Sequence, residues 1–121
     1  MIKANELRIG NYLHDFHGQL IVEVTWDIIK DLQQNIKFHP PKPIPLTPEI
    51  LEKAGFKKDE NKANVFSNGN ELLIEVTEKG FQSVIESDWP ELIDIGNPIH
   101  YLHQLQNLYF ALTGTELEVN L

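Results

Sequence analysis

The sequence predicts an α+β fold with an N-terminal β-hairpin, a short helix after a proline loop, an antiparallel β-meander and one main C-terminal helix packed on the sheet. Three observations predict this class. Short β-branched runs are separated by Gly and Asn turns, five prolines in residues 40–48 lead into a well-specified helix start, and an apolar stripe at helical spacing lies near the C-terminus. We expect the 121 residues to form a single compact domain, 1–121.

The N-terminal region is predicted to form a hairpin. Residues 7–13 and 19–25 are rich in apolar residues, and the second run alternates partly and is β-branched. Residues 14–18 make a short connection in which Gly18 is available for a positive φ. Residues 26–35 are ambiguous, because their apolar residues have helical spacing but the segment is short. We expect a turn or one to two turns of helix there.

The proline-rich segment 40–48 has three open interpretations. It could be an interdomain linker, a polyproline II ligand for a proline-binding module, or an ordered loop packed on the domain. The third is favoured because the segment leads into a helix whose two ends are both specified by sequence. A flexible linker has no need of such signals.

That helix is predicted over residues 48–54. Thr47 is placed as its N-cap, and a proline follows at the first helical position. Gly55 is a favoured left-handed terminator, and Phe56 can fold back onto Leu51 as in a Schellman motif.

A β-meander is predicted next, with three strands and two turns. The strands are residues 64–67, 71–77 and 81–86, joined by turns at 68–70 and 78–80. The dipeptide Asn68-Gly69 is the strongest hairpin signal in the chain. Residues 91–95 are a candidate fourth strand, and residues 116–119 a candidate final edge strand.

The stretch "YLHQLQNLYFALTG" (101–114) is predicted to be helical although it contains no Asp, Glu, Lys or Arg. Asn97-Pro98 is expected to cap its start and Gly114 to end it. The apolar residues fall within one arc of the helical wheel, which predicts the face that packs on the sheet. This stripe comprises Tyr101, Leu102, Leu105, Leu108, Tyr109 and Leu112.

The opposite side of this helix is the candidate interaction surface. Its residues are His100, His103, Gln104, Asn107 and Phe110. Amide side chains tolerate partial burial because they lack the desolvation penalty of a charge, whereas a solvent face normally carries Lys and Glu. We therefore expect this side to contact the N-terminal strands, a second copy or a different protein, with ligand or metal chemistry as a further alternative.

Composition limits the classes of function. Ten Lys and Arg against 18 Asp and Glu give a net charge of −8, and no basic residue follows Lys79. An acidic half repels phosphate, so direct nucleic-acid binding is not expected. The absence of Cys excludes disulfides and thiol chemistry. No segment is apolar enough to predict export or a membrane span, so we expect a cytoplasmic protein.

Catalytic signals are weak. Two His-x-x-His pairs, His14/His17 and His100/His103, have a spacing at which two imidazoles can share a metal ion. No phosphate-binding glycine loop, nucleophile motif or assignable carboxylate pair accompanies them. The sequence therefore predicts no catalytic residue, no cofactor and no assigned metal site.

Three segments resemble a family of short uncharacterised bacterial proteins that are often encoded on prophages and other mobile elements. They are "NELRIGNYL" (5–13), "IPLTPEILEKAGF" (44–56) and "YLHQLQNLYFALTGTEL" (101–117), of which the last is the most specific. The resemblance implies a compact protein accessory to a mobile element, and it carries no activity, cofactor or catalytic residue to any position.

The leading functional hypothesis is a non-enzymatic protein-interaction module that associates with itself or with another protein. The alternative is a small metal-dependent enzyme that uses a His-x-x-His pair. A third hypothesis, based on the acidic charge, is an inhibitor of a nucleic-acid-binding protein.

Overall fold

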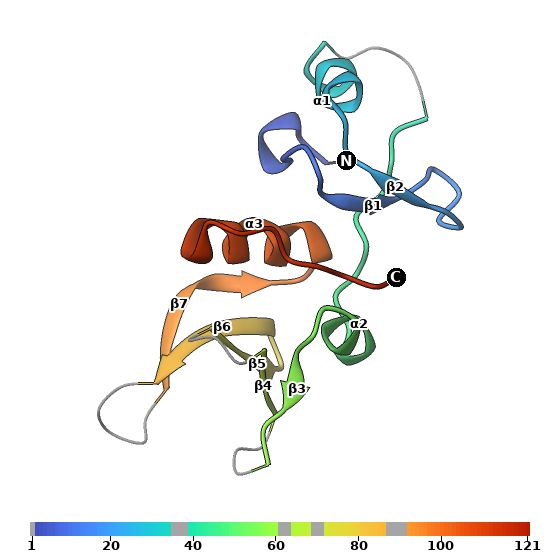
Figure 1. The fold of residues 1–121 in the computed structure, drawn as a ribbon. Helices are drawn as coiled ribbons and strands as arrows, with labels where there is room; N and C mark the ends of the chain where they lie inside the picture. The colour runs from blue at the N-terminus through green and yellow to red at the C-terminus, as the bar shows by residue number, and fades with distance from the viewer. Residues whose placement is uncertain (1, 35–38, 61–63, 69–71, 87–91) are drawn as a thin grey trace. The chain divides into compact units, whose positions relative to one another are not determined.

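The computed structural model confirms the α+β class, with a hairpin, a short helix after the proline loop, an antiparallel sheet and a main C-terminal helix (Figure 1). The residues it describes are 2–34, 39–60, 64–68, 72–86 and 92–121. The chain divides into two compact units, and each is described by itself. Unit 1 comprises residues 1–45 and 101–116, and unit 2 comprises residues 46–100 and 117–121. The single domain expected from the sequence stays a prediction.

Unit 1 contains the predicted hairpin and the main helix. Its elements are the 3-10 helix η1 (Ala4–Glu6), β1 (Tyr12–His14), β2 (Ile21–Glu23), α1 (Trp26–Gln33) and α3 (Leu102–Thr113). Strands β1 and β2 pair antiparallel with Leu13 opposite Val22, and Gly18 in the connection has a φ of 74°. Both strands are shorter than predicted. The ambiguous segment is a helix as far as Gln33, and its last residue, Asn35, lies outside the described residues.

Burial of apolar side chains explains how the N-terminal part of unit 1 packs. Leu13 of β1 and Val24 just after β2 are fully buried and form a cluster with Ile2 and Leu7. Helix α1 packs two partly buried side chains, Ile29 and Leu32, against this cluster. The cluster takes one face of the hairpin, which leaves Ile21 and Glu23 on the other face exposed.

Unit 2 begins with α2 (Pro48–Lys53), whose predicted ends are both confirmed. The Oγ1 of Thr47 accepts a hydrogen bond from a backbone N–H of the first turn at 3.2 Å. At the other end, Gly55 has a φ of 87°, and the Phe56 N–H donates to the Leu51 carbonyl at 2.9 Å. This is the Schellman arrangement, and the side chains of Leu51 and Phe56 are both fully buried.

The remainder of unit 2 is a five-stranded antiparallel sheet in which each strand pairs with the next in sequence. The strands are β3 (Lys57–Lys58), β4 (Val65–Ser67), β5 (Leu73–Thr77), β6 (Gly80–Glu86) and β7 (Leu92–Ile99). The three-stranded meander and the fourth strand are confirmed over the described residues, which leave out the predicted first positions of two strands, 71 and 91. Strand β3 is an addition too short for sequence patterning to detect. The turn predicted at 68–70 includes positions outside the described residues. Val65, Leu73 and Val84 form a buried cluster of the sheet.

The predicted start of the C-terminal helix is wrong. Asn97 and Pro98 belong to β7 and do not cap a helix; α3 begins at Leu102, with Tyr101 as its N-cap. β7 lies at the edge of the sheet, where a proline is tolerated because its missing N–H leaves no ladder bond unmade. The predicted end is confirmed, since Gly114 has a φ of 73°.

The final edge strand predicted at residues 116–119 is also absent: residues 115–121 contain no strand. In unit 2, the side chain of Leu117 is buried, and the Asn120 N–H donates to the Lys53 carbonyl at 2.9 Å, which attaches this tail to the end of α2. Among the helices of the described residues, none has the length and apolar character needed to cross a bilayer.

Candidate functional site: the polar face of the C-terminal helix

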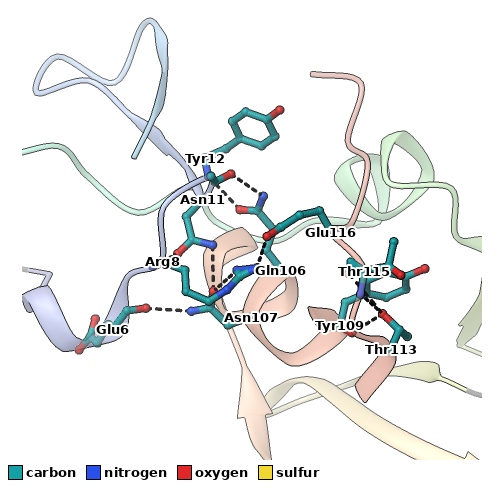
Figure 2. A network of polar contacts seen from close by, with 11 residues as sticks. Glu6, Arg8, Asn11, Tyr12, Gln106, Asn107, Tyr109, Thr113, Thr115 and Glu116 are labelled. Carbon is teal, nitrogen blue, oxygen red and sulfur yellow. Dashed lines mark hydrogen bonds and ion pairs between the residues drawn. The ribbon is translucent and has the colours of Figure 1, made fainter. Parts of the chain in front are cut away.

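The amide of Gln106 anchors α3 to the N-terminal segment of unit 1 (Figure 2). Its Oε1 accepts a hydrogen bond from the backbone N–H of Tyr12 at 2.8 Å, and its Nε2 donates to the Gly10 carbonyl at 3.3 Å. Only 1 % of Gln106 is exposed, so these two bonds replace hydration that the amide has lost. The side chain of Gln106 thus occupies the backbone N–H of Tyr12 on the edge of β1 that faces away from β2, which we call the outer edge of β1.

Asn107, the next residue, makes a second anchor with three partners (Figure 2). Its Oδ1 accepts from Asn11 Nδ2 at 2.9 Å and from Arg8 Nη1 at 3.1 Å. Its Nδ2 donates to the Glu6 carbonyl at 2.9 Å. Asn11 is fully buried, and its own Oδ1 accepts from the Arg8 backbone N–H at 2.7 Å. The two asparagines therefore tie the chain before β1 to the middle of α3.

Arg8 extends this network toward the end of α3. Its guanidinium pairs with the carboxylate of Glu116 and lies over the ring of Phe110, 4.2 Å from the centroid. Both members of the ion pair are partly exposed, so the pair itself contributes at most about 1 kcal/mol. Its main effect is to hold the guanidinium over the aromatic ring, which covers part of Phe110.

His103 is the most unusual group on this face. It is 1 % exposed, and neither ring nitrogen has a hydrogen-bond partner. The ring stacks on Tyr101 with 5.9 Å between centroids, and Nε2 lies 4.0 Å from Glu6 Oε2. Burial lowers the pKa of His103 below its ordinary value of 6.5, and the nearby Glu6 carboxylate opposes the shift only in part.

This arrangement predicts that unit 1 loses stability on acidification. The unfolded chain takes up a proton at His103 near pH 6.5, whereas the folded unit resists protonation because its pKa is lower. The free energy of unfolding should therefore fall as the pH drops through 6.5 toward the folded pKa. His103→Leu removes the titrating group and should flatten this part of the profile. Urea denaturation at a series of pH values measures it, and an identical slope in both proteins would contradict the assignment.

The structure places the predicted surface residues in different environments. His103 is buried and Asn107 is bonded to the N-terminal segment within unit 1. Gln104 is half-buried and its Oε1 accepts from the Tyr101 backbone N–H at 3.1 Å, while Phe110 is exposed beneath Arg8. His100 is exposed and belongs to unit 2. His103 is therefore buried within its own chain, which was one of the alternatives that the sequence left open.

Sequence reasoning missed four side chains of this network: Arg8, Asn11, Gln106 and Glu116. The absence of charge in the helix was the available signal for Gln106, because an uncharged polar residue suits a buried hydrogen-bonded position. Arg8 and Asn11 carry no such signal, since nothing in residues 5–13 shows which side chains face a segment almost a hundred residues away. The predicted apolar stripe is fully buried at Leu102 and Leu105, whereas Leu112 is exposed.

The contacts at this face are hydrogen bonds of amide side chains, the Arg8–Glu116 ion pair and the cation–π contact of Arg8 with Phe110, and together they anchor the helix to the N-terminal segment. Over the described ranges, no three His, Asp or Glu side chains are grouped so that they could hold a metal ion. Comparisons of the chain with protein-family models, with curated proteins and with solved structures find no match.

Proposed function

We propose that this protein is a non-enzymatic interaction module that associates with a second copy of itself through unit 1. The observation that carries the proposal is the uneven distribution of exposed apolar side chains. The described residues include nine large apolar side chains that are exposed, and eight of them belong to unit 1. Exposed apolar groups concentrated in one part of a molecule are typical of a surface that contacts another protein.

Four of these side chains lie on the hairpin or next to its ends, and we call them the hairpin surface. They are Ile9, Leu20, Ile21 and Trp26, with exposed fractions of 62, 66, 43 and 60 %. The Gly10 N–H donates to the Val24 carbonyl at 3.0 Å, so the two chain segments at the open end of the hairpin lie next to each other. Ile9 belongs to the first of these segments and Trp26 to the second. Aromatic residues such as Trp are enriched among the side chains that supply most of the binding energy in protein interfaces, and the buried core of an interface is more apolar than its rim.

Charge favours the same unit. Unit 1 carries five Lys and Arg against six Asp and Glu, a net −1, whereas unit 2 carries five against twelve, a net −7. Two copies that meet through unit 1 bring together the units of smaller net charge, so repulsion between the copies is weaker than in a contact through unit 2. The acidic unit 2 then maintains solubility. Direct binding to nucleic acid is not part of the proposal, because the basic residues form no excess in either unit.

We propose the hairpin surface, and not the polar face of α3, as the contact between the two copies. His103 is buried and Asn107 is hydrogen-bonded to the N-terminal segment, so neither side chain is available to a second protein. The resemblance of residues 44–56 and 101–117 to proteins of prophages and mobile elements supports a role as a cytoplasmic accessory protein of such an element.

Sedimentation velocity over a range of protein concentrations tests the proposal. We expect a reversible shift from the 13.9 kDa monomer to a dimer as the concentration rises. The double variant L20S/W26S should raise the dimer dissociation constant about tenfold or more, because it removes two large apolar side chains from the contact. Both positions are highly exposed, so the fold should be retained.

Leu121→Ser is the matched control, since it makes the same kind of change at an exposed leucine of unit 2. It should leave the dissociation constant unchanged. A protein that remains monomeric up to its solubility limit would overturn self-association.

A further inference from the structure

The two edges of the hairpin sheet are not equivalent. The Val24 N–H donates to the Asn11 carbonyl at 2.8 Å, and the Asp15 N–H donates to the Leu20 carbonyl at 2.9 Å. Hydrogen-bonded positions alternate along an antiparallel pair, so Leu20, Val22 and Val24 direct their backbone groups toward β1. The N–H and C=O groups of Ile21 and Glu23 consequently point away from β1, along the outer edge of β2.

The outer edge of β1 is closed within unit 1. The Tyr12 N–H donates to Gln106 Oε1 at 2.8 Å, and the N–H and C=O of His14 pair with the backbone of Lys42 at 2.9 Å in each direction. Strand β2 has no such cover: in the part of the chain that the structure describes, β1 is its sole paired neighbour. An uncovered strand edge is a template for pairing with another strand.

We propose that β2 pairs antiparallel with β2 of a second copy across a two-fold axis at Val22, which joins two hairpins into a four-stranded sheet. This inference rests on the self-association proposed above and specifies its geometry. In this register Ile21 of each copy lies opposite Glu23 of the other, and each such pair exchanges two backbone hydrogen bonds. The contact is isologous, as a two-fold interface requires.

Charge favours this arrangement over those that pair Glu23 with Glu23. Two carboxylates directly opposite each other destabilise a strand pair, and a parallel in-register pairing would place Glu23 beside Glu23. The antiparallel two-fold arrangement avoids that and sets each Glu23 across from an aliphatic side chain. Unit 1 has a net charge of only −1, so a second copy approaches without strong repulsion.

The closed edge of β1 also limits the size of the assembly. After two β2 strands have paired, the outer strands of the four-stranded sheet are the two β1 strands, which are covered by Gln106 and Lys42. Over the described residues no uncovered edge of the hairpin sheets then remains, so growth by pairing of hairpin edges stops at two copies.

Glu23→Pro tests the geometry because it deletes the outward N–H and leaves the hydrogen bonds to β1 in place. We expect its dimer dissociation constant to rise about tenfold or more relative to wild type. Glu23→Thr is the matched control: it removes the same carboxylate but keeps the N–H, and it should still dimerise. The two variants together separate the backbone contribution from the charge.

Amide hydrogen exchange, followed by NMR on the wild-type protein, gives the second readout. The N–H groups of Ile21 and Glu23 should become more protected as the concentration rises, whereas Val24, which is bonded within the hairpin, should not change. A dimer that leaves these two amides unprotected, or that tolerates Glu23→Pro, overturns edge pairing while self-association stands. A strictly monomeric protein overturns both proposals, and the β2 edge would then be left to a strand of a different protein.

Discussion

Gln106→Ala is expected to lower the free energy of unfolding of unit 1 by about 2–4 kcal/mol, because it leaves two backbone groups of the N-terminal segment without partners. The groups are the Tyr12 N–H and the Gly10 carbonyl, both bonded to this amide. Alanine is a better helix former than glutamine, so intrinsic propensity acts in the opposite direction and cannot produce the loss. Urea denaturation followed by circular dichroism and by amide exchange in α3 measures the change.

Leu112→Ala is the control for this substitution. It lies on the same helix, but its side chain is exposed, so the free energy of unfolding should change by no more than about 0.5 kcal/mol. A Gln106→Ala variant as stable as this control would show that the amide is not an anchor.

Phe56→Ala is expected to destabilise unit 2 by about 3–5 kcal/mol, the usual cost of removing a fully buried aromatic ring. The ring follows the Gly55 terminator of α2, and its backbone N–H closes the helix on the Leu51 carbonyl. Loss of the ring leaves a cavity beside Leu51, which is also fully buried. Exchange of the buried Ile74 amide in the neighbouring sheet reports the stability of this unit separately from that of unit 1.

Phe16→Ala provides the matched control, because it removes the same ring from an exposed position in the hairpin connection. Its cost should stay below about 1 kcal/mol. Equal losses of stability at the two positions would contradict the assignment of the Phe56 ring to the hydrophobic core of unit 2.

Local signals in the sequence predict an element correctly where its limits depend on residues close to it in the chain. The ends of α2 are set by Thr47 and Gly55, whose side-chain oxygen and left-handed backbone act within a few residues of the helix. The meander was predictable for the same reason, since its strands pair with the next strand in sequence.

The same local reasoning failed at Pro98. A proline after Asn97 is typical of a helix start, yet β7 is an edge strand and tolerates it equally well. The choice between these interpretations depends on where the strand lies in the sheet, which no short window of sequence reveals. The two-residue strand β3 was missed because periodicity needs more positions than it has.

The function of the polar helix face could be predicted only in part. The absence of charge correctly indicates a face that is not fully hydrated, but the partner is the segment from Glu6 to Tyr12, about a hundred residues earlier in the chain. Contacts between residues so far apart in the chain produce no periodic pattern in a single sequence. The exposure of the β2 edge could not be predicted from the sequence either, because it depends on which edge of the hairpin Gln106 and Lys42 cover.

A double-mutant cycle between Asn11 and Asn107 tests the central claim, that the uncharged face of α3 is occupied by the N-terminal segment of the same chain. The hydrogen bond between their side chains spans 2.9 Å. We predict that the single and double alanine variants give a coupling energy of about 1 kcal/mol or more, which does not change when the protein is diluted. A coupling near zero, or one that disappears on dilution, would contradict the claim and place this face between molecules.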